Sequence, residues 1–145
     1  MEVYTIGFAR KTAREFFGAL KRAGIKQLLD VRLNNTSQLA GFTKREDLAF
    51  FLTEICGAAY RHELLLAPTQ EMLTAFGKRK RDWPEYETRF LALLAERHVE
   101  TQLDRKLFET STVLLCSEAT PEHCHRRLVA EYLERQWQNV TVNHL

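Results

Sequence analysis

Short runs with the character of β-strands alternate with longer amphipathic segments, and this alternation constrains the fold more than any other feature of the sequence. The runs are residues 3–7, 28–32, 59–64, 112–116 and 140–144. Strands that alternate with helices are typical of βαβ units, in which the sheet is mainly parallel and helices cover both of its faces. The sequence therefore predicts an α/β fold, a three-layer domain with a mainly parallel sheet of about five strands.

The segments between these strands carry apolar residues at helical spacing. Helices are predicted over residues 12–23, 44–55, 68–76, 83–97 and 121–137, with one more helical segment over 99–107. No internal repeat, low-complexity segment or linker divides the sequence. Residues 1–145 are therefore expected to form a single domain, which is long enough to bury a core of its own.

The overall composition is that of a globular protein in a reducing compartment. Hydrophobic residues make up 45% and charged residues 28% of the chain, and the longest apolar runs are far too short to span a bilayer. The N-terminus enters a strand without a basic and apolar leader, and the cysteines number three, which does not fit a disulfide framework. We therefore expect a cytoplasmic protein without a membrane partner. The net charge of +2 permits an anionic substrate without requiring one.

Residues 114–127 are the most chemically informative part of the chain. An apolar strand ends there in Cys116, and Glu118 follows it. Open α/β sheets bind ligands where strand ends face helix starts. The neighbouring strand ends are expected to bring Gly7 and Asp30 to the same edge. The sequence therefore predicts a functional site at the carboxyl edge of the sheet.

The helix after this strand is expected to start with reactive side chains. Thr120 is a good N-cap and Pro121 suits the first helical position. That start would place Cys124, His125 and Arg126 in the first two turns, near the positive end of the helix dipole. On the helical wheel His125 lies among the apolar positions, so its ring is expected to face the sheet.

Two possible chemistries use the thiols. A cysteine beside a helix N-terminus, a histidine and an arginine has a lowered pKa, which makes Cys124 or Cys116 a candidate nucleophile. In the other, the two cysteines and either His125 or His62 hold a metal ion. Seven residues separate the cysteines, unlike the pairs in structural zinc sites, and adjacent helical residues project about 100° apart. We therefore assign no metal ligands and no cofactor from the sequence.

Two further interpretations use the charged side chains. In one, the helix start binds phosphate or another anion with Arg126 and Arg32, while Glu118 or Asp30 transfers protons. In the other, the residues form a buried structural network. His125 would then hydrogen-bond Asp30 or Glu118, Arg32 would pair with a carboxylate, and the cysteines would pack as small apolar side chains.

Motifs along the whole chain resemble one known family. They are Tyr-Thr-Ile-Gly at 4–7, Asp-Val-Arg at 30–32 with Ser37 and Phe42 after it, Tyr60 with His62, Leu-Cys-x-Glu at 115–118, and Cys-His-Arg at 124–126. In this order they are similar to the prokaryotic family called domain of unknown function 488. The resemblance implies that the motifs meet at one sheet edge, and it implies no particular activity.

The resemblance completes the set of candidate substrate-binding residues, which are Arg32, Arg126, Gly7, Tyr60 and His62. The chain also departs from the family pattern. Phe8 and Ala9 stand where the family usually has histidine and serine, and Asn35 stands where a proline is common.

We expect an enzyme or ligand-binding domain that acts on a small anionic substrate, phosphorylated or nucleotide-like, at the carboxyl edge of the sheet. The alternative is a nucleic-acid-binding module without catalysis, in which the basic run 78–81 contacts phosphates and Trp83 stacks on a base. The balanced charge and the position of Trp83 in an apolar helical stripe favour the first. Glycine-rich nucleotide and Walker motifs are absent from the sequence, so it predicts no dinucleotide cofactor.

Overall fold

A computed structural model describes residues 1–36, 41–77 and 82–145. Its strands are β1 Glu2–Gly7, β2 Gln27–Asp30, β3 Ala59–His62, β4 Thr112–Cys116 and β5 Thr141–His144. Within the described ranges they form one sheet in the order β3-β2-β4-β1-β5, and every pairing is parallel. The predicted α/β fold with a parallel sheet is confirmed.

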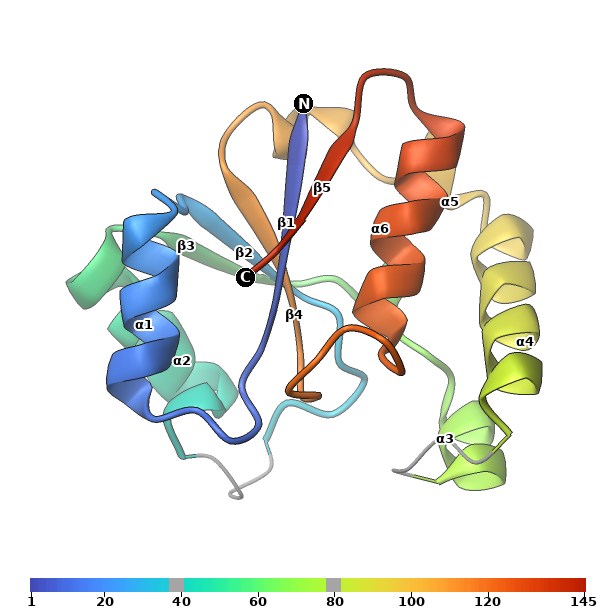
Figure 1. Ribbon diagram of the computed structural model, residues 1–145, viewed down its shortest axis with the longest axis horizontal. Helices are drawn as coiled ribbons and strands as arrows, with labels where there is room; N and C mark the ends of the chain where they lie inside the picture. Colours follow the sequence, from blue (N-terminus) through green and yellow to red (C-terminus); the bar gives the residue numbers. More distant parts are fainter. Residues whose placement is uncertain (37–40, 78–81) are drawn as a thin grey trace.

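The strand register brings the sequence motifs together at one edge of the sheet. Gly7 at the end of β1 is paired with Cys116 at the end of β4. On the other side of β4, Asp30 of β2 is paired with Leu115, and His62 of β3 with Asp30. Because parallel strands end at the same edge, these residues all lie at the carboxyl edge of the sheet, whose strands are labelled in Figure 1.

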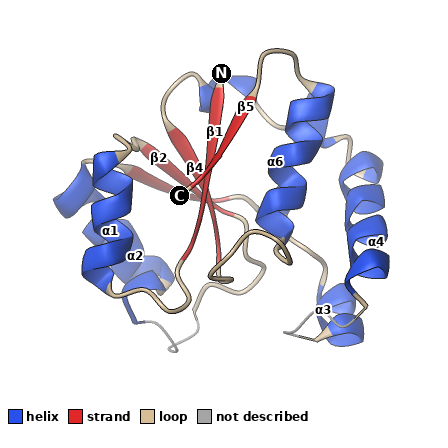
Figure 2. Ribbon diagram, viewed as in Figure 1, coloured by secondary structure: helices blue, strands red, loops and turns tan. Residues whose placement is uncertain are grey.

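Helices cover both faces of the sheet (Figure 2). They are α1 Ala13–Arg22, α2 Arg45–Phe51, α3 Gln70–Phe76, α4 Trp83–Glu96, α5 Val99–Gln102 and α6 His125–Gln136. The central strand β4 is buried throughout and supplies both cores. Val113 and Leu115 pack under α1 and α2, whereas Leu114 and Cys116 pack under α3, α4 and α6. The domain therefore has the three layers that the sequence predicts.

The layer of α1 and α2 follows its sequence signals closely. Thr12 caps α1 by accepting a hydrogen bond from the Glu15 amide, and the Glu15 carboxylate accepts one from the Thr12 amide. The second predicted helix changes type within its length. It is α-helical to Phe51, continues as a π-helical turn over Leu52–Cys56, and ends at Gly57 with a φ of 62°.

The start of α6 differs from the prediction, because the helix begins at His125 and not at Pro121. Thr120 does not cap it, and the Thr120 side chain lowers the pKa of Glu122 instead. The N-cap is Cys124, with extended dihedrals of φ −134° and ψ 136°. This later start keeps Cys124 and His125 in the core. Burial of these two side chains therefore outweighs the local capping signal.

Other predicted elements keep their type but are shorter. β2 and β3 each end two residues earlier than predicted, at Asp30 and His62. α3 begins two residues later, after its N-cap Thr69. The helical segment predicted over 99–107 is divided into α5 and a 3-10 turn, Arg105–Phe108.

In the three described ranges, no helix is both long and apolar enough to cross a membrane. The basic run 78–81 and the loop residue Ser37 lie outside the described residues.

Candidate functional site

Asp30 is the centre of a closed hydrogen-bond network at the end of β2. Its carboxylate accepts hydrogen bonds from the Arg32 amide at 3.2 Å and from the Arg32 guanidinium at 2.8 and 2.9 Å. The Tyr60 hydroxyl donates a further one at 2.6 Å. Arg32 also donates to the Thr43 carbonyl, and the Phe8 ring lies 5.2 Å from its guanidinium carbon. These contacts favour a structural role for both charges, as in the network interpretation.

Tyr60 and His62 extend this network from β3. Burial, and then the hydrogen bond to Asp30, raise the pKa of the Tyr60 hydroxyl. That hydroxyl accepts a hydrogen bond of 3.0 Å from Asn35, the residue at the position where the family commonly has proline. The His62 ring donates from Nε2 to the Arg32 carbonyl at 2.6 Å. Both family-motif residues therefore fix the loop after β2.

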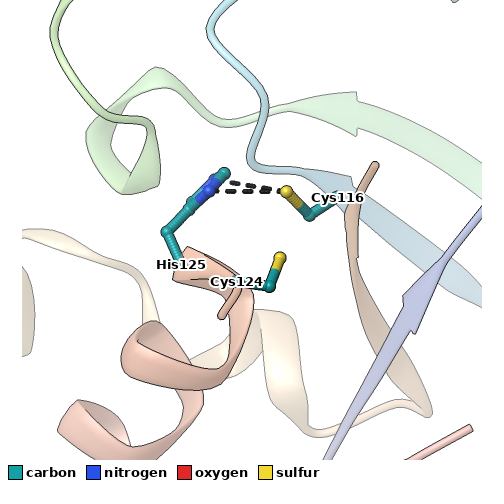
Figure 3. A group of neighbouring side chains, drawn as sticks. All are labelled: Cys116, Cys124 and His125. Atoms are coloured by element: carbon teal, nitrogen blue, oxygen red, sulfur yellow. Dashed lines mark hydrogen bonds between the residues drawn. The ribbon is translucent and has the colours of Figure 1, made fainter. Parts of the chain in front are cut away.

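The second cluster at this edge is formed by Cys116, Cys124 and His125 (Figure 3). One side-chain ligand atom of each lies within 4.8 Å of those of the other two. The Cys116 sulfur is 3.4 Å from His125 Nδ1, while His125 Nε2 is 2.7 Å from the Val31 carbonyl oxygen. Their exposed fractions are only 2%, 0% and 4%. None of the three cysteines of the chain, all of which are described, forms a disulfide.

This geometry confirms one expectation for the cluster and corrects two others. The His125 ring does face the sheet, but it is bonded to Val31 and not to Asp30 or Glu118. The adjacent side chains of Cys124 and His125 do not diverge, because Cys124 precedes the helix and has extended dihedrals. The expected 100° separation applies only within a helix. Among the described residues, His125 joins the two cysteines and His62 does not.

Arg126 follows His125 in the first turn of α6, and its guanidinium lies next to Gly7 at the end of β1. Its side chain has no exposed surface, and Nη1 donates to the Glu118 carbonyl at 2.7 Å. Its Nε has no hydrogen-bond partner. No described carboxylate forms an ion pair with this guanidinium. The structure therefore holds a buried positive charge that is only partly satisfied.

Burial, and then the Arg126 charge, lower the pKa values of two other basic groups, Lys11 and His144. The pKa of Lys11 is lowered, first by burial and then by Arg126. The pKa of His144 is lowered by the same two causes, and its Nδ1 lies 2.6 Å from the Thr5 hydroxyl oxygen. The Arg126 charge therefore acts on both groups, and carboxylates oppose its effect on the pKa, Glu15 at Lys11 and both Glu131 and Glu122 at His144.

Gly7 permits the close approach of Arg126 to the end of β1. A Cβ atom at Gly7 would lie 1.5 Å from the Glu118 carbonyl oxygen and 2.8 Å from Arg126 Nη1. The sequence indicates a turn or a close approach at this glycine. The structure identifies the neighbour as the backbone that follows β4.

Tyr86 is a site residue that the sequence reasoning missed. It projects from α4, and its hydroxyl has a pKa raised by burial first and then by Cys116, Cys124 and Glu118. Its ring stacks on Phe90, which contacts the His125 ring edge-on at 5.4 Å. In the sequence Tyr86 is one member of an apolar helical stripe. No sequence signal distinguishes it from a core residue.

Comparison with known proteins establishes the family. A family model described as "Domain of unknown function DUF488" matches residues 12–133. The chain belongs to the DUF488 family. The matched part contains Asp30, Cys116 and His125, whereas the Tyr-Thr-Ile-Gly motif at 4–7 precedes it. No curated protein and no solved structure matches this DUF488 chain.

Proposed function

We propose that this DUF488 domain binds a small oxyanion of the phosphate class, as the anionic group of a phosphorylated or nucleotide-like substrate. The binding position is the carboxyl edge of the sheet, between the end of β1 and the start of α6. The observation that carries this proposal is the buried guanidinium of Arg126, which lacks a carboxylate partner in the described part of the chain.

Electrostatics support an anionic ligand at this position. Burial of an unpaired ion costs several kcal/mol even after relaxation of the protein. The start of α6 adds positive potential, because its first amide groups have no partner within the helix. Lys11 and His144 are close enough for Arg126 to lower their pKa values. A bound phosphate would reduce the repulsion between Arg126 and each of these two groups and accept charge-assisted hydrogen bonds.

The candidate residues divide into anchors and supports under this proposal. Arg126 is the anchor, Gly7 admits the backbone that positions it, and the partly exposed Glu118 is the candidate for proton transfer. Asp30 and Arg32 satisfy each other, so they support the edge rather than contact the ligand. The domain acts as an enzyme if Glu118 is needed for turnover of the bound substrate, and as a ligand-binding domain if it is not.

Calorimetric titration with inorganic phosphate and with a nucleoside monophosphate tests the proposal. Arg126→Gln removes the anchor, and Arg126→Lys keeps the charge without the fork of donors. Arg135→Gln is the matched control, since it removes an exposed arginine at the opposite end of α6. We expect Arg126→Gln to weaken phosphate binding at least tenfold, which corresponds to about 1.4 kcal/mol. We expect Arg126→Lys to be intermediate and Arg135→Gln to bind like the wild type.

Two results would overturn the proposal. The first is the absence of phosphate and nucleotide binding to the folded wild-type protein at millimolar concentration. The second is equal affinity of the wild type and a folded Arg126→Gln variant, with folding checked by circular dichroism.

The contacts of Trp83 support this proposal over a nucleic-acid-binding module. The Trp83 ring already stacks on Tyr86 at 5.3 Å and on His123 at 5.0 Å, and the Arg127 guanidinium lies 5.8 Å away. Base stacking would require displacement of these partners. Gel-shift binding that is lost when residues 78–81 are neutralised, yet retained in Arg126→Gln, would favour the module instead.

A further inference from the structure

We propose that Cys116, Cys124 and His125 form a binding site for a thiophilic divalent metal ion of the Zn²⁺ class. This site lies at the same sheet edge as Arg126 but on the opposite side of the first turn of α6, and it does not depend on the anion proposal. The three residues come from the end of β4, the N-cap of α6 and its first helical position.

The separations among the three side chains fit a tetrahedral ion. With Zn–S bonds of about 2.3 Å and Zn–N bonds of about 2.0 Å, ligand atoms lie about 3.8 Å apart for two sulfurs and about 3.5 Å apart for sulfur and nitrogen. The Cys116 sulfur is 3.4 Å from His125 Nδ1, and no pair of ligand atoms exceeds 4.8 Å. The Cys116 sulfur lies at similar distances from both ring nitrogens, 3.4 Å from Nδ1 and 3.8 Å from Nε2, so the thiol must reorient toward Nδ1 when the ion binds.

The hydrogen bond between His125 and the Val31 carbonyl leaves the second ring nitrogen of His125 available to a metal ion. A carbonyl oxygen only accepts hydrogen bonds, so the contact of 2.7 Å with Val31 requires the proton on Nε2. The lone pair is then on Nδ1, which is the nitrogen nearer to the Cys116 sulfur. Metal-binding histidines typically donate their other ring N–H to such an acceptor.

Burial favours a metal ligand set over a thiol nucleophile. Cys116 and Cys124 are almost completely buried, and burial in apolar surroundings disfavours the lone thiolate that a nucleophile requires. Two thiolates neutralise a divalent ion, so that burial of the whole group costs less than burial of one thiolate. Binding would displace the two thiol protons to solvent. Three protein ligands leave a fourth position, which in catalytic zinc sites holds water or substrate.

Titration of the metal-free, reduced full-length chain with Co²⁺ tests this site, because Co²⁺ reports thiolate ligands by charge-transfer absorption. We expect the wild type to bind one Co²⁺ per chain with charge-transfer and tetrahedral visible bands, and Zn²⁺ to displace it. Cys116→Ser and Cys124→Ser should each lose most of this absorption. Cys56→Ser is the matched control, since it removes a thiol outside the cluster and should keep the full spectrum.

A measurement on the wild type covers the case in which a cluster variant does not fold. Zn²⁺ should slow alkylation of Cys116 and Cys124 by iodoacetamide at least tenfold in partly destabilising urea, and leave Cys56 unchanged. The proposal is overturned if Co²⁺ does not bind with one-to-one stoichiometry, if the cluster variants keep the spectrum, or if Zn²⁺ gives no selective protection. None of these results depends on phosphate binding at Arg126.

Discussion

The contact between Gly7 and the backbone after β4 makes Gly7→Ala the sharpest test of the site geometry. The added Cβ atom would lie 1.5 Å from the Glu118 carbonyl oxygen and 2.7 Å from its carbonyl carbon. It would also lie 2.8 Å from Arg126 Nη1, which donates to that same oxygen. Two of the three nearest atoms are backbone, so rotation of a side chain cannot relieve the clash.

The expected loss of folding stability follows from the atoms that the added Cβ must displace. Forced overpacking in a closely packed region costs about 1–3 kcal/mol. Displacement of the Glu118 carbonyl also breaks its hydrogen bond from the Arg126 guanidinium, and hydrogen bonds to charged groups contribute about 1.5–3 kcal/mol. Together we expect the free energy of unfolding to fall by about 2.5–6 kcal/mol. For a domain of this size that corresponds to a decrease in melting temperature of the order of 10 °C.

Urea denaturation followed by far-ultraviolet circular dichroism measures this effect. Gly18→Ala is the control, because Gly18 lies within α1 and its added Cβ would meet only the flexible end of the Arg22 side chain, at 3.1 Å. Alanine is the better helix former by about 0.5–1 kcal/mol, so this variant should unfold at slightly higher urea. A Gly7→Ala protein with the wild-type urea midpoint would refute the close packing of the β1 end against Glu118 and Arg126.

Two further predictions concern local interactions away from the site. Thr12→Ala should lower the free energy of unfolding by about 1 kcal/mol in urea denaturation at neutral pH, because the hydrogen bond that the Glu15 amide donates to the Thr12 hydroxyl is lost, while the backbone amide of residue 12 can still donate to the Glu15 carboxylate. Hydrogen bonds from Thr12 to the Glu15 carboxylate, from the backbone first and then from the side chain, lower the pKa of Glu15, so the stabilisation by the Thr12 side chain should decline as pH falls through that pKa, and an equal effect of Thr12→Ala near pH 3 would contradict the reasoning. Burial, and then the hydrogen bond to Glu100, raise the pKa of Tyr132 to about 12, so the folded state keeps a proton that the unfolded state loses above about pH 10. The urea midpoint should therefore fall as pH rises above 10, and Tyr132→Phe should make this fall smaller. If Tyr132→Phe left the pH dependence of the midpoint unchanged, other groups would be its cause.

The fold could be predicted from the sequence because each strand carries its own signal. The central strand 112–116 is entirely apolar or small, as expected of a strand covered on both faces, and it is buried throughout. The convergence of Gly7, Asp30 and Cys116 was also predictable, since parallel strands end at one edge. The register then pairs Gly7 with Cys116 directly.

The spacing of Asp30 and Arg32 in the sequence already indicates that these two residues pair. Residues two apart at a strand end project to the same face, so the Asp30 carboxylate is the nearest candidate partner of Arg32. The structure shows this pair with two guanidinium hydrogen bonds. An arginine with a carboxylate at that spacing is therefore better explained as a support of the site than as an anion anchor.

The first residue of α6 could not be predicted, because local capping interactions and distant packing interactions favour different starting points for the helix. Thr120 and Pro121 satisfy the local rules for a helix start. Burial of Cys124 and His125 against β4 and the segment after β2 depends on contacts that are far apart in sequence, such as that of His125 with Val31. Tyr86 was missed for the same reason, since only the packing of α4 beside α6 brings its hydroxyl near the thiols.

The boundary of α6 also determines the chemistry that this edge can support. Consecutive helical residues project about 100° apart, so the first turn directs His125 to the carbonyl of Val31 and Arg126 to the loop at Glu118. With Cys124 inside the helix, its sulfur would be rotated by a similar angle from the His125 ring, and the thiol–imidazole cluster would open. With Cys124 as the N-cap, the same connection presents the buried Arg126 guanidinium together with a cluster of two thiols and one imidazole. The proposed metal site therefore depends on the extended backbone of Cys124.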